Sequence, residues 1–347
     1  MKKVLLFLLC LVLIIPKVNS STSSAYEYVL MDIDSGRVLA SKNKDSPRLI
    51  ASITKIMTAI IAIEKKDVFD IVKVDESISK SYGSGIYISI GEEISLLDLL
   101  YGLMLRSGND AAMMIASYVA GSEEEFAKLM NDKAKELGMK NTIFYNASGL
   151  DTKTIGNKST AYDMALLTSY AMKNDIYKEI VKTKKHTVKT NLKTYIWHNK
   201  NKLLSESYIT GGKTGYTERA KRTLVSTASK DGMNLVVVTI NDSDDWNTHK
   251  TLYNMAFNTY KSIKVLNKKN FTVIKDNYYD KLYIKNNYYL TLKKDESKSL
   301  VSYIKLEKKK NYKTGDKVGD NYIYLGNTLV HTEPIYAKKY NKVWFKK

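Results

Sequence analysis

The stretch around which this chain is organised is ASITKIMTAIIAIEKK, residues 51–66. It contains no Gly or Pro and ends in lysines, where the helix dipole favours positive charge, so we expect one helix. Ser52 and Lys55 are three residues apart, which places a hydroxyl and an amine on one helix face within contact distance. A neutral lysine can take the proton of a serine hydroxyl and make its oxygen nucleophilic. The stretch therefore predicts a candidate catalytic pair.

Alone, the Ser-x-x-Lys pattern is weak evidence. It also occurs at residues 41–44, 77–80 and 302–305. A serine at a helix start followed by a surface lysine produces the same spacing without any chemistry. The pair is therefore interpreted together with the other motifs of the chain.

A second candidate motif is Ser107-x-Asn109, which lies between two segments of helical periodicity. The hydroxyl can relay a proton, and the amide can hold a substrate carbonyl. Serine, glycine and asparagine also favour helix ends and turns, so a purely structural role is the alternative at this point.

The third motif is Lys213-Thr214-Gly215, which follows two glycines and is expected on a strand. The lysine offers a fixed positive charge, the threonine hydroxyl can bind a carboxylate, and the glycine allows a ligand backbone to approach closely. A second Lys-Thr-Gly at 313–315 has turn-forming neighbours. We expect a β-turn without a catalytic role there.

The N-terminus has the pattern of a secretory signal peptide. Lys2 and Lys3 precede an apolar run over residues 4–15 that is too short for a comfortable membrane span. We expect an exported protein with a leader over residues 1–24. The single cysteine, Cys10, lies inside this leader, so the mature chain is expected to have neither disulfides nor thiol chemistry.

The positive charge of the chain is concentrated near its end. Of the formal net charge of +19, residues 261–347 carry most, with 21 lysines against 8 acidic residues. In an exported protein, anionic membrane surfaces or wall polymers are the expected partners of such a segment, and nucleic acid is not. The alternative, that these lysines only reflect a lysine-rich composition and bind no partner, stays open. The scattered histidines give no metal pattern, and we expect no cofactor.

The order of expected elements indicates an α+β fold. A β-hairpin over residues 26–41 precedes a mostly helical region over 95–180, and strands return over 208–240 before a closing helix at 252–260. The first hairpin and the late strands bracket the helical region, so we expect them to pair in one mainly antiparallel sheet. This gives one domain over 25–260. Short alternating segments predict a small, basic, all-β domain over 261–347.

Together the three motifs are more specific for one class of protein than any of them is alone. Their order and structural context are those of penicillin-binding proteins and class A β-lactamases. The chain resembles the low-molecular-mass penicillin-binding proteins that act as serine-type D-alanyl-D-alanine carboxypeptidases. The resemblance covers most of residues 26–260 and rests on LMD (30–32), SG (35–36), ASITKIMTAIIAIE (51–64), MLRSGNDAA (104–112), LGM (137–139), NASGLD (146–151), AYDMA (161–165) and GKTGYT (212–217).

The resemblance implies a β-lactamase/transpeptidase-like catalytic domain followed by a small β domain. It also implies a mechanism. Ser52 would attack the carbonyl between the two terminal D-alanines of a peptidoglycan stem peptide. Lys55 would take the serine proton, with its pKa lowered by burial and by Lys213. Ser107 would pass a proton to the departing D-alanine.

The remaining motif residues would bind the substrate. Asn109 would orient the substrate amide and the catalytic lysine, and Thr214 with Lys213 would hold the terminal carboxylate. The oxyanion hole would be made of the backbone N–H groups of Ser52 and Tyr216, next to Gly215. β-Lactam antibiotics would mimic the dipeptide and trap the serine.

Two alternatives remain at this stage. A β-lactamase would share the trio, although residues 146–151 follow the carboxypeptidase pattern and we place no deacylating glutamate. A wall-binding protein with a degenerate site would be expected to lack some motif residues, and all are present.

Two features depart from the family. Only residues 338–347 follow the β domain in place of a long amphipathic helix, which predicts weak attachment or release, and position 216 is Tyr where some members have His.

Overall fold

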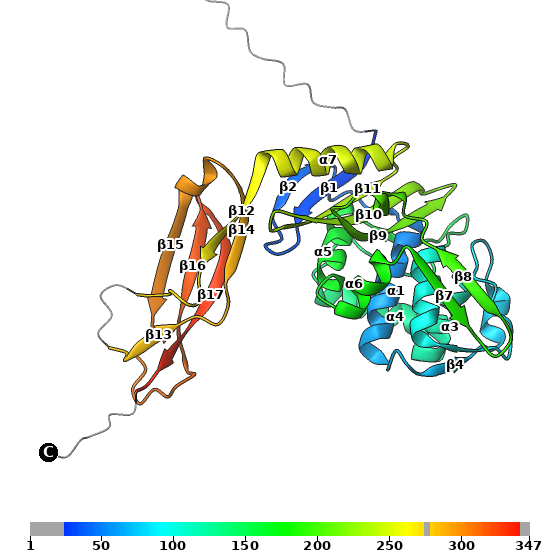
Figure 1. Cartoon of the computed structure of the whole chain (residues 1–347), viewed down its shortest axis with the longest axis horizontal. Helices are drawn as coiled ribbons and strands as arrows, with labels where there is room; N and C mark the ends of the chain where they lie inside the picture. The colour runs from blue at the N-terminus through cyan, green and yellow to red at the C-terminus, as the bar shows by residue number, and fades with distance from the viewer. Residues whose placement is uncertain (1–23, 274–277, 341–347) are drawn as a thin grey trace, which may run out of the picture.

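The computed structural model describes residues 24–273 and 278–340. The expected leader, except for its last residue, and the end of the basic tail lie outside the described residues. Within these ranges no helix combines the length and the apolarity that a bilayer crossing requires. Figure 1 shows a helix-rich part built on a sheet, and a separate β part that follows the long helix α7.

A five-stranded antiparallel sheet forms the frame of the larger part. Its order is β2-β1-β11-β10-β9. The strands are β1 (Glu27–Asp32), β2 (Val38–Lys42), β9 (Ile209–Thr217), β10 (Lys221–Lys230) and β11 (Met233–Ile240). The N-terminal hairpin pairs with the late strands through β1 and β11, with Val29 opposite Val238. The predicted α+β fold with one antiparallel sheet is therefore confirmed.

Helices cover both faces of this sheet. The helices and tight helical turns are η1 (Ala51–Thr54), α1 (Lys55–Lys65), η2 (Glu76–Lys80), α2 (Leu96–Tyr101), the π-helix η3 (Gly102–Arg106), α3 (Asn109–Ala120), α4 (Glu123–Glu136), α5 (Ala161–Ala171), α6 (Asp175–Lys182), η4 (Lys202–Ser205) and α7 (Asp245–Thr259). One face packs with α1 and the helical region around Ile56, Phe126 and Val236. The other packs with α7 around Leu224, Leu235 and Tyr253.

Three short two-stranded sheets complete the larger part. They pair β3 (Arg48–Leu49) with β6 (Lys158–Ser159), β4 (Ile71–Lys73) with β5 (Glu93–Ser95), and β7 (Lys185–Lys189) with β8 (Thr194–His198).

The sequence located most helices but not their breaks. The helix expected from residue 51 begins as the tight turn η1, because Ala51 has a φ of 49°, outside the helical region. The helical region expected from residue 95 is interrupted between its two segments, because Ser107 adopts the left-handed conformation with a φ of 65°. The closing helix α7 begins at Asp245, earlier than expected, and α6 was not predicted.

Face-on contacts between α7 and the sheet bury one histidine completely. His249 lies between two hydroxyls, with Nδ1 2.6 Å from Ser226 Oγ and Nε2 3.1 Å from Thr239 Oγ1. Burial lowers the pKa of His249 to about 3. The ring is therefore neutral in the folded protein at neutral pH.

The C-terminal part consists of two packed sheets. One pairs β12 (Tyr260–Leu266) with β14 (Tyr288–Lys293), and the other has the order β13-β17-β16-β15. The strands of the second sheet are β13 (Lys281–Tyr283), β15 (Leu300–Leu306), β16 (Lys317–Leu325) and β17 (Thr328–Lys338), and the short turn η5 (Glu296–Ser299) precedes β15. Leu290, Leu292 and Ile335 are among the residues of the core between the sheets.

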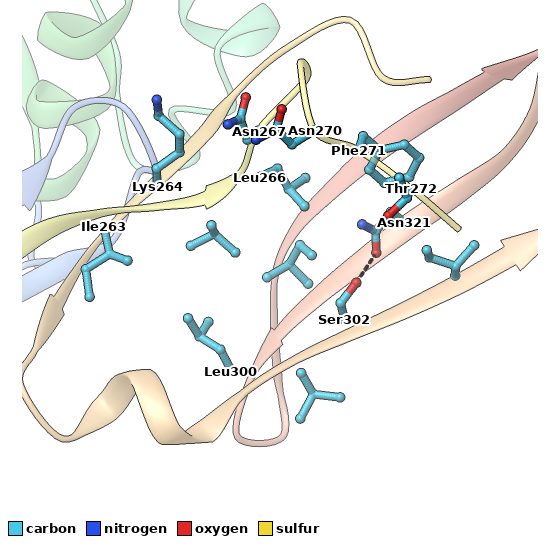
Figure 2. A pocket seen from close by; sticks show the side chains of 14 residues that line it. Ile263, Lys264, Leu266, Asn267, Asn270, Phe271, Thr272, Leu300, Ser302 and Asn321 are labelled. Carbon is cyan, nitrogen blue, oxygen red and sulfur yellow. Dashed lines mark hydrogen bonds between the residues drawn. The ribbon is translucent and has the colours of Figure 1, made fainter. Parts of the chain in front are cut away.

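An open groove of about 510 Å³ runs between the edge strands β12 and β15. Figure 2 shows Leu300 and Ser302 of β15 beside this groove, together with Leu266 and Phe271 from the opposite side. On its floor, Ser302 Oγ donates a hydrogen bond to the buried Asn321 at 2.7 Å.

The two parts are joined without a linker. Helix α7 ends at Thr259 and β12 begins at the next residue. Across the joint, the Arg37 guanidinium donates to both carboxylate oxygens of Glu296 at 2.6 and 3.0 Å, and to the Thr291 carbonyl at 2.6 Å. The Thr291 hydroxyl donates to Asp32. A bidentate guanidinium–carboxylate pair fixes orientation as well as distance.

Candidate active site

Ser52 and Lys55 lie side by side at the junction of η1 and α1. The Lys55 Nζ is 3.1 Å from the Ser52 Oγ. The serine is partly exposed, whereas the lysine has no exposed surface. The tight turn therefore presents the hydroxyl to solvent and leaves the amine behind it.

Two carbonyl oxygens hold the lysine amine. Lys55 Nζ donates to Asn109 Oδ1 at 2.8 Å and to the backbone carbonyl of Ser148 at 2.5 Å. The pKa of Lys55 is lowered from 10.5 to about 7, mainly by burial and also by the charge of Lys200, while Asp110 opposes the shift. At neutral pH a large fraction of Lys55 is therefore the free base.

Burial, one of the two causes expected for this shift, is confirmed as the largest, and Lys213 is a second buried amine coupled to Lys55. Burial lowers the pKa of Lys213 well below 10.5, and the charges of Lys55 and Lys200 lower it further. Repulsion between two ammonium groups is mutual, so each buried amine disfavours the charge of the other.

The second motif flanks the break between η3 and α3. Ser107 is the left-handed residue that ends η3, and Asn109 is the first residue of α3. The amide of Asn109 connects the Lys55 amine to the loop before it, since its Nδ2 donates to the Tyr82 carbonyl at 2.6 Å. The carboxylate of Asp110 accepts from the backbone N–H groups of Ile86 and Tyr87. This loop is thereby tied to the site.

The third motif lies on β9, the edge strand of the sheet. The Lys213 amine is buried and donates to Ser107 Oγ at 3.1 Å and to the Thr214 carbonyl at 2.7 Å. The side chain of Lys213 therefore reaches the second motif from behind. The three motifs expected from the sequence thus meet at one place.

Gly215 is required by the packing of β9 against η1. A Cβ on Gly215 would lie 2.4 Å from Thr223 Oγ1 and 2.9 Å from the Ser52 backbone nitrogen. Both distances are shorter than side-chain carbons adopt. The sequence attributed this glycine to the approach of a ligand, and the structure adds the approach of the strand to the turn that carries Ser52.

A cleft of about 300 Å³ opens beside the serine. Its walls include Ser52, Ser107, Thr214, Gly215 and Tyr216 from the predicted set, and Ser84, Lys200, Arg222, Thr223, Asp245 and Trp246 from outside it. Lys55, Asn109 and Lys213 lie behind this wall, in contact with it.

Arg222 was missed by the sequence reasoning. It is opposite Tyr216 in the β9–β10 pairing, donates to Asp245 Oδ1 at 2.5 Å, and has its guanidinium carbon 5.4 Å from the Trp246 ring centre. The hairpin that follows Lys213-Thr214-Gly215 was the available signal, because its partner strand must place a residue across from Tyr216. Lys200 and Ser148 carried no such signal.

The second Lys-Thr-Gly lies far from these residues in the C-terminal part. Lys313 and Asp316 close a tight turn, in which the Asp316 backbone N–H donates to the Lys313 carbonyl at 3.1 Å. The β-turn expected there is confirmed.

Comparison with known families places the chain. A family model described as D-alanyl-D-alanine carboxypeptidase matches residues 16–244, well over half of the chain. The chain belongs to this carboxypeptidase family. A second model, described as the C-terminal domain of penicillin-binding protein 5, matches residues 258–342. The family resemblance inferred from the motifs is confirmed.

Curated relatives of the carboxypeptidase family carry the same name. D-alanyl-D-alanine carboxypeptidase DacF of Bacillus subtilis is 37% identical over 257 residues, which are 71% of this chain and 65% of DacF. DacC of Escherichia coli is 35% identical over 264 residues, 71% of this chain and 64% of DacC. The chain thus spans slightly under two thirds of the length of these relatives.

Solved structures of the family share the fold. Penicillin-binding protein 5 from Haemophilus influenzae is 25% identical, with a TM-score of 0.77 over 93% of this chain and 98% of that one. The D-alanyl-D-alanine carboxypeptidase DacD from Francisella tularensis is 27% identical, with a TM-score of 0.69 over 91% of this chain and 93% of that one.

Proposed function

We propose that the chain is a serine-type D-alanyl-D-alanine carboxypeptidase, which removes the terminal D-alanine from peptidoglycan stem pentapeptides through an acyl-enzyme on Ser52. The observation that carries the proposal is the bonding of Lys55. A neutral amine has two N–H groups and one lone pair. The carbonyl oxygens of Asn109 and Ser148 only accept hydrogen bonds, so they engage both N–H groups. The lone pair is then left for the Ser52 hydroxyl.

Acylation follows from this arrangement. Lys55 takes the hydroxyl proton while the Ser52 oxygen bonds to the substrate carbonyl carbon. The backbone N–H groups of Ser52 and Tyr216 stabilise the negative oxygen that results. The closeness of the Gly215 Cα to the Ser52 nitrogen supports this pairing, because it brings the two backbones together.

The leaving group departs on the side of Ser107. The C–N bond breaks as Ser107 delivers a proton to the nitrogen of the departing D-alanine, and the proton that Lys55 took from Ser52 replaces it on Ser107. Its hydroxyl suits this role because it lines the cleft and also contacts the Lys213 amine. Water then hydrolyses the acyl-enzyme and restores Ser52.

The terminal carboxylate of the substrate binds at the Thr214 hydroxyl, with Lys213 behind it. A bound carboxylate favours the protonated form of Lys213 and so opposes the effect of burial. Arg222 and Lys200, which line the same cleft, add positive charge there. Asn109 orients the substrate amide as well as Lys55.

The wider setting belongs to the same proposal. Residues 1–24 form a cleaved leader, residues 25–260 the catalytic domain and residues 261–347 the basic β domain. The enzyme is exported and acts at the cell wall or the outer face of the membrane. β-Lactams acylate Ser52, and the basic domain contacts anionic wall polymers or headgroups weakly.

The test is D-alanine release from a peptide ending in Lys-D-Ala-D-Ala, with the Ser52→Ala variant as control. Release that disappears in the variant supports the proposal. If the wild type releases nothing, the proposed activity is wrong. Intact mass after penicillin treatment then separates the alternatives, since a β-lactamase returns to its unmodified mass quickly and a wall-binding protein never forms an adduct.

A further inference from the structure

The outer face of the four-stranded C-terminal sheet is rich in tyrosine. Successive side chains of a strand point to opposite faces, and Leu300 and Ser302 of β15 border the groove between the two sheets (Figure 2). Tyr303 and Lys305 therefore point to the outer face, whereas Val301 also lines the groove. In the pairing register, Val301, Tyr303 and Lys305 are opposite Tyr324, Tyr322 and Asp320 of β16.

The same face continues across β17 and β13. Asp320 is opposite Pro334, Lys317 is opposite Tyr336, and Tyr336 is opposite Tyr283. We define the tyrosine face by five rings, which are Tyr283, Tyr303, Tyr322, Tyr324 and Tyr336.

Rings of the tyrosine face lie in contact with one another. The ring centres of Tyr303 and Tyr322 are 6.3 Å apart, and those of Tyr283 and Tyr336 are 5.7 Å apart. The two pairs are tilted by only 34° and 32°. They form two ring pairs on the same face, and the register places Asp320 and Pro334 between them.

Lysines surround these rings. The cations at or beside the face are Lys281, Lys285, Lys305, Lys317 and Lys338, and the Lys285 amine is 3.9 Å from the Tyr336 ring centre. Asp320 is the one acidic residue that the register places on this face within the described strands, and it is bound to Lys317 at 2.8 Å. The face therefore carries a positive excess.

The face is most open to solvent at its β15 edge, whereas its other four rings are half-buried. Tyr303 is 57% exposed, and Val301 at its margin is 56% exposed. Figure 1 shows β12 and β14 next to α7, with β15, β16 and β17 farther from the catalytic part. An aromatic surface of this kind on a soluble protein marks an interaction site.

The chemistry of the face fits a sugar polymer that bears carboxylates. A tyrosine ring offers an apolar face for the C–H groups of a sugar ring and a hydroxyl for hydrogen bonds. Lysines complement negative charge along the polymer. Insertion into a bilayer instead uses Trp, Phe and Leu side chains, and of these types only Leu329 is exposed on the described outer face.

We propose that the tyrosine face binds the glycan strands of peptidoglycan, the polymer that carries the stem peptides. This inference rests on the proposed carboxypeptidase function for the identity of the polymer. The face would hold the enzyme on its polymeric substrate, while the cleft acts on one stem peptide at a time.

The test is co-sedimentation with insoluble peptidoglycan from which phosphate-containing polymers have been removed by acid. Every protein carries Ser52→Ala, so that turnover is absent and the cleft is the same throughout. The test variant adds Tyr303→Ser and Tyr322→Ser. The matched control adds Tyr289→Ser, because Tyr289 is also exposed, at 40%, but lies on β14 of the other sheet.

We expect the test variant to bind about tenfold more weakly than the parent, because two aromatic contact surfaces are lost, and the control to bind like the parent. Equal binding by test variant and parent overturns the inference. So does a defect seen only with intact walls that retain phosphate polymers, or only with anionic lipid vesicles, since either result assigns the face to another partner.

Two further measurements keep the result interpretable. If the double variant loses its cooperative thermal unfolding, Tyr303→Ala alone is measured, since more than half of that side chain is exposed. We then expect about a threefold loss of binding. Unchanged binding overturns the inference. D-alanine release from a soluble peptide is measured with Ser52 intact. We expect it to be unchanged in the tyrosine variants, so a failure of the carboxypeptidase proposal is seen separately.

Discussion

The replacement Asn109→Asp tests the role of Lys55 as a base. It changes one atom of a side chain that lies 2.8 Å from the Lys55 amine. A carboxylate there stabilises the protonated lysine, so its pKa must rise. The pKa of Lys55 in the wild type is about 7, because burial disfavours its charge.

Coulomb's law gives the size of the effect. Unit charges 2.8 Å apart interact by about 6 kcal/mol at an effective dielectric constant near 20. Asn109 is buried, so the new carboxylate resists ionisation and part of this energy is lost. Half of it, about 3 kcal/mol, changes the protonation equilibrium of Lys55 roughly a hundredfold.

The assay is the rate of acylation by a chromogenic β-lactam between pH 6 and pH 10. The wild-type rate should rise with pH and reach half its maximum near the pKa of Lys55, about 7. In Asn109→Asp the rate at pH 7 should fall about a hundredfold and recover at alkaline pH. Asn109→Ala is the control, because it removes the hydrogen bond without adding charge, and its loss should not recover. An Asn109→Asp profile parallel to the wild-type profile would refute the role of Lys55.

Three further predictions follow from other contacts. Ser52→Ala should form no covalent adduct with penicillin, and an adduct in its intact mass would place the nucleophile elsewhere. Gly215→Ala places a carbon 2.4 Å from Thr223 Oγ1 and 2.9 Å from the Ser52 nitrogen; acylation should fall about a hundredfold, and a wild-type rate would show that β9 and η1 can separate freely. The pKa of His249 in the folded state is about 3, which is below its value in the unfolded chain. As pH falls below about 6.5, His249 is therefore protonated in the unfolded chain before it is protonated in the folded protein, and the fold loses stability. Relative to His249→Gln, which does not titrate, the wild type should lose roughly 3 kcal/mol of unfolding free energy between pH 7 and pH 4, and parallel pH dependences would contradict this.

Short sequence patterns predicted correctly those turns and contacts that form between residues close in sequence. The β-turn at Lys313 was expected from its turn-forming neighbours, and the Asp316 backbone N–H donates to the Lys313 carbonyl as such a turn requires. The Ser52–Lys55 contact arises within one helical turn for the same reason. Periodicity likewise located the antiparallel hairpin at the N-terminus.

The missed features depend on contacts between distant parts of the chain. Ser148 contacts Lys55 from 93 residues away, and Arg37 contacts Glu296 across 259 residues. No short spacing encodes such pairs, because each is set by the packing of whole elements. The contribution of Lys200 to the Lys55 pKa shift was missed for the same reason, since Lys200 acts through the assembled site, whereas burial was expected.

The continuity of α7 and β12 has a geometrical consequence. The C-terminal sheets cannot swing on a tether, because the helix passes directly into the strand and Arg37 fixes the joint. The junction and the Arg37 contacts therefore restrict how the outer sheet can move relative to the serine. An enzyme held by that sheet would therefore reach stem peptides within a limited distance of the glycan segment that the sheet binds.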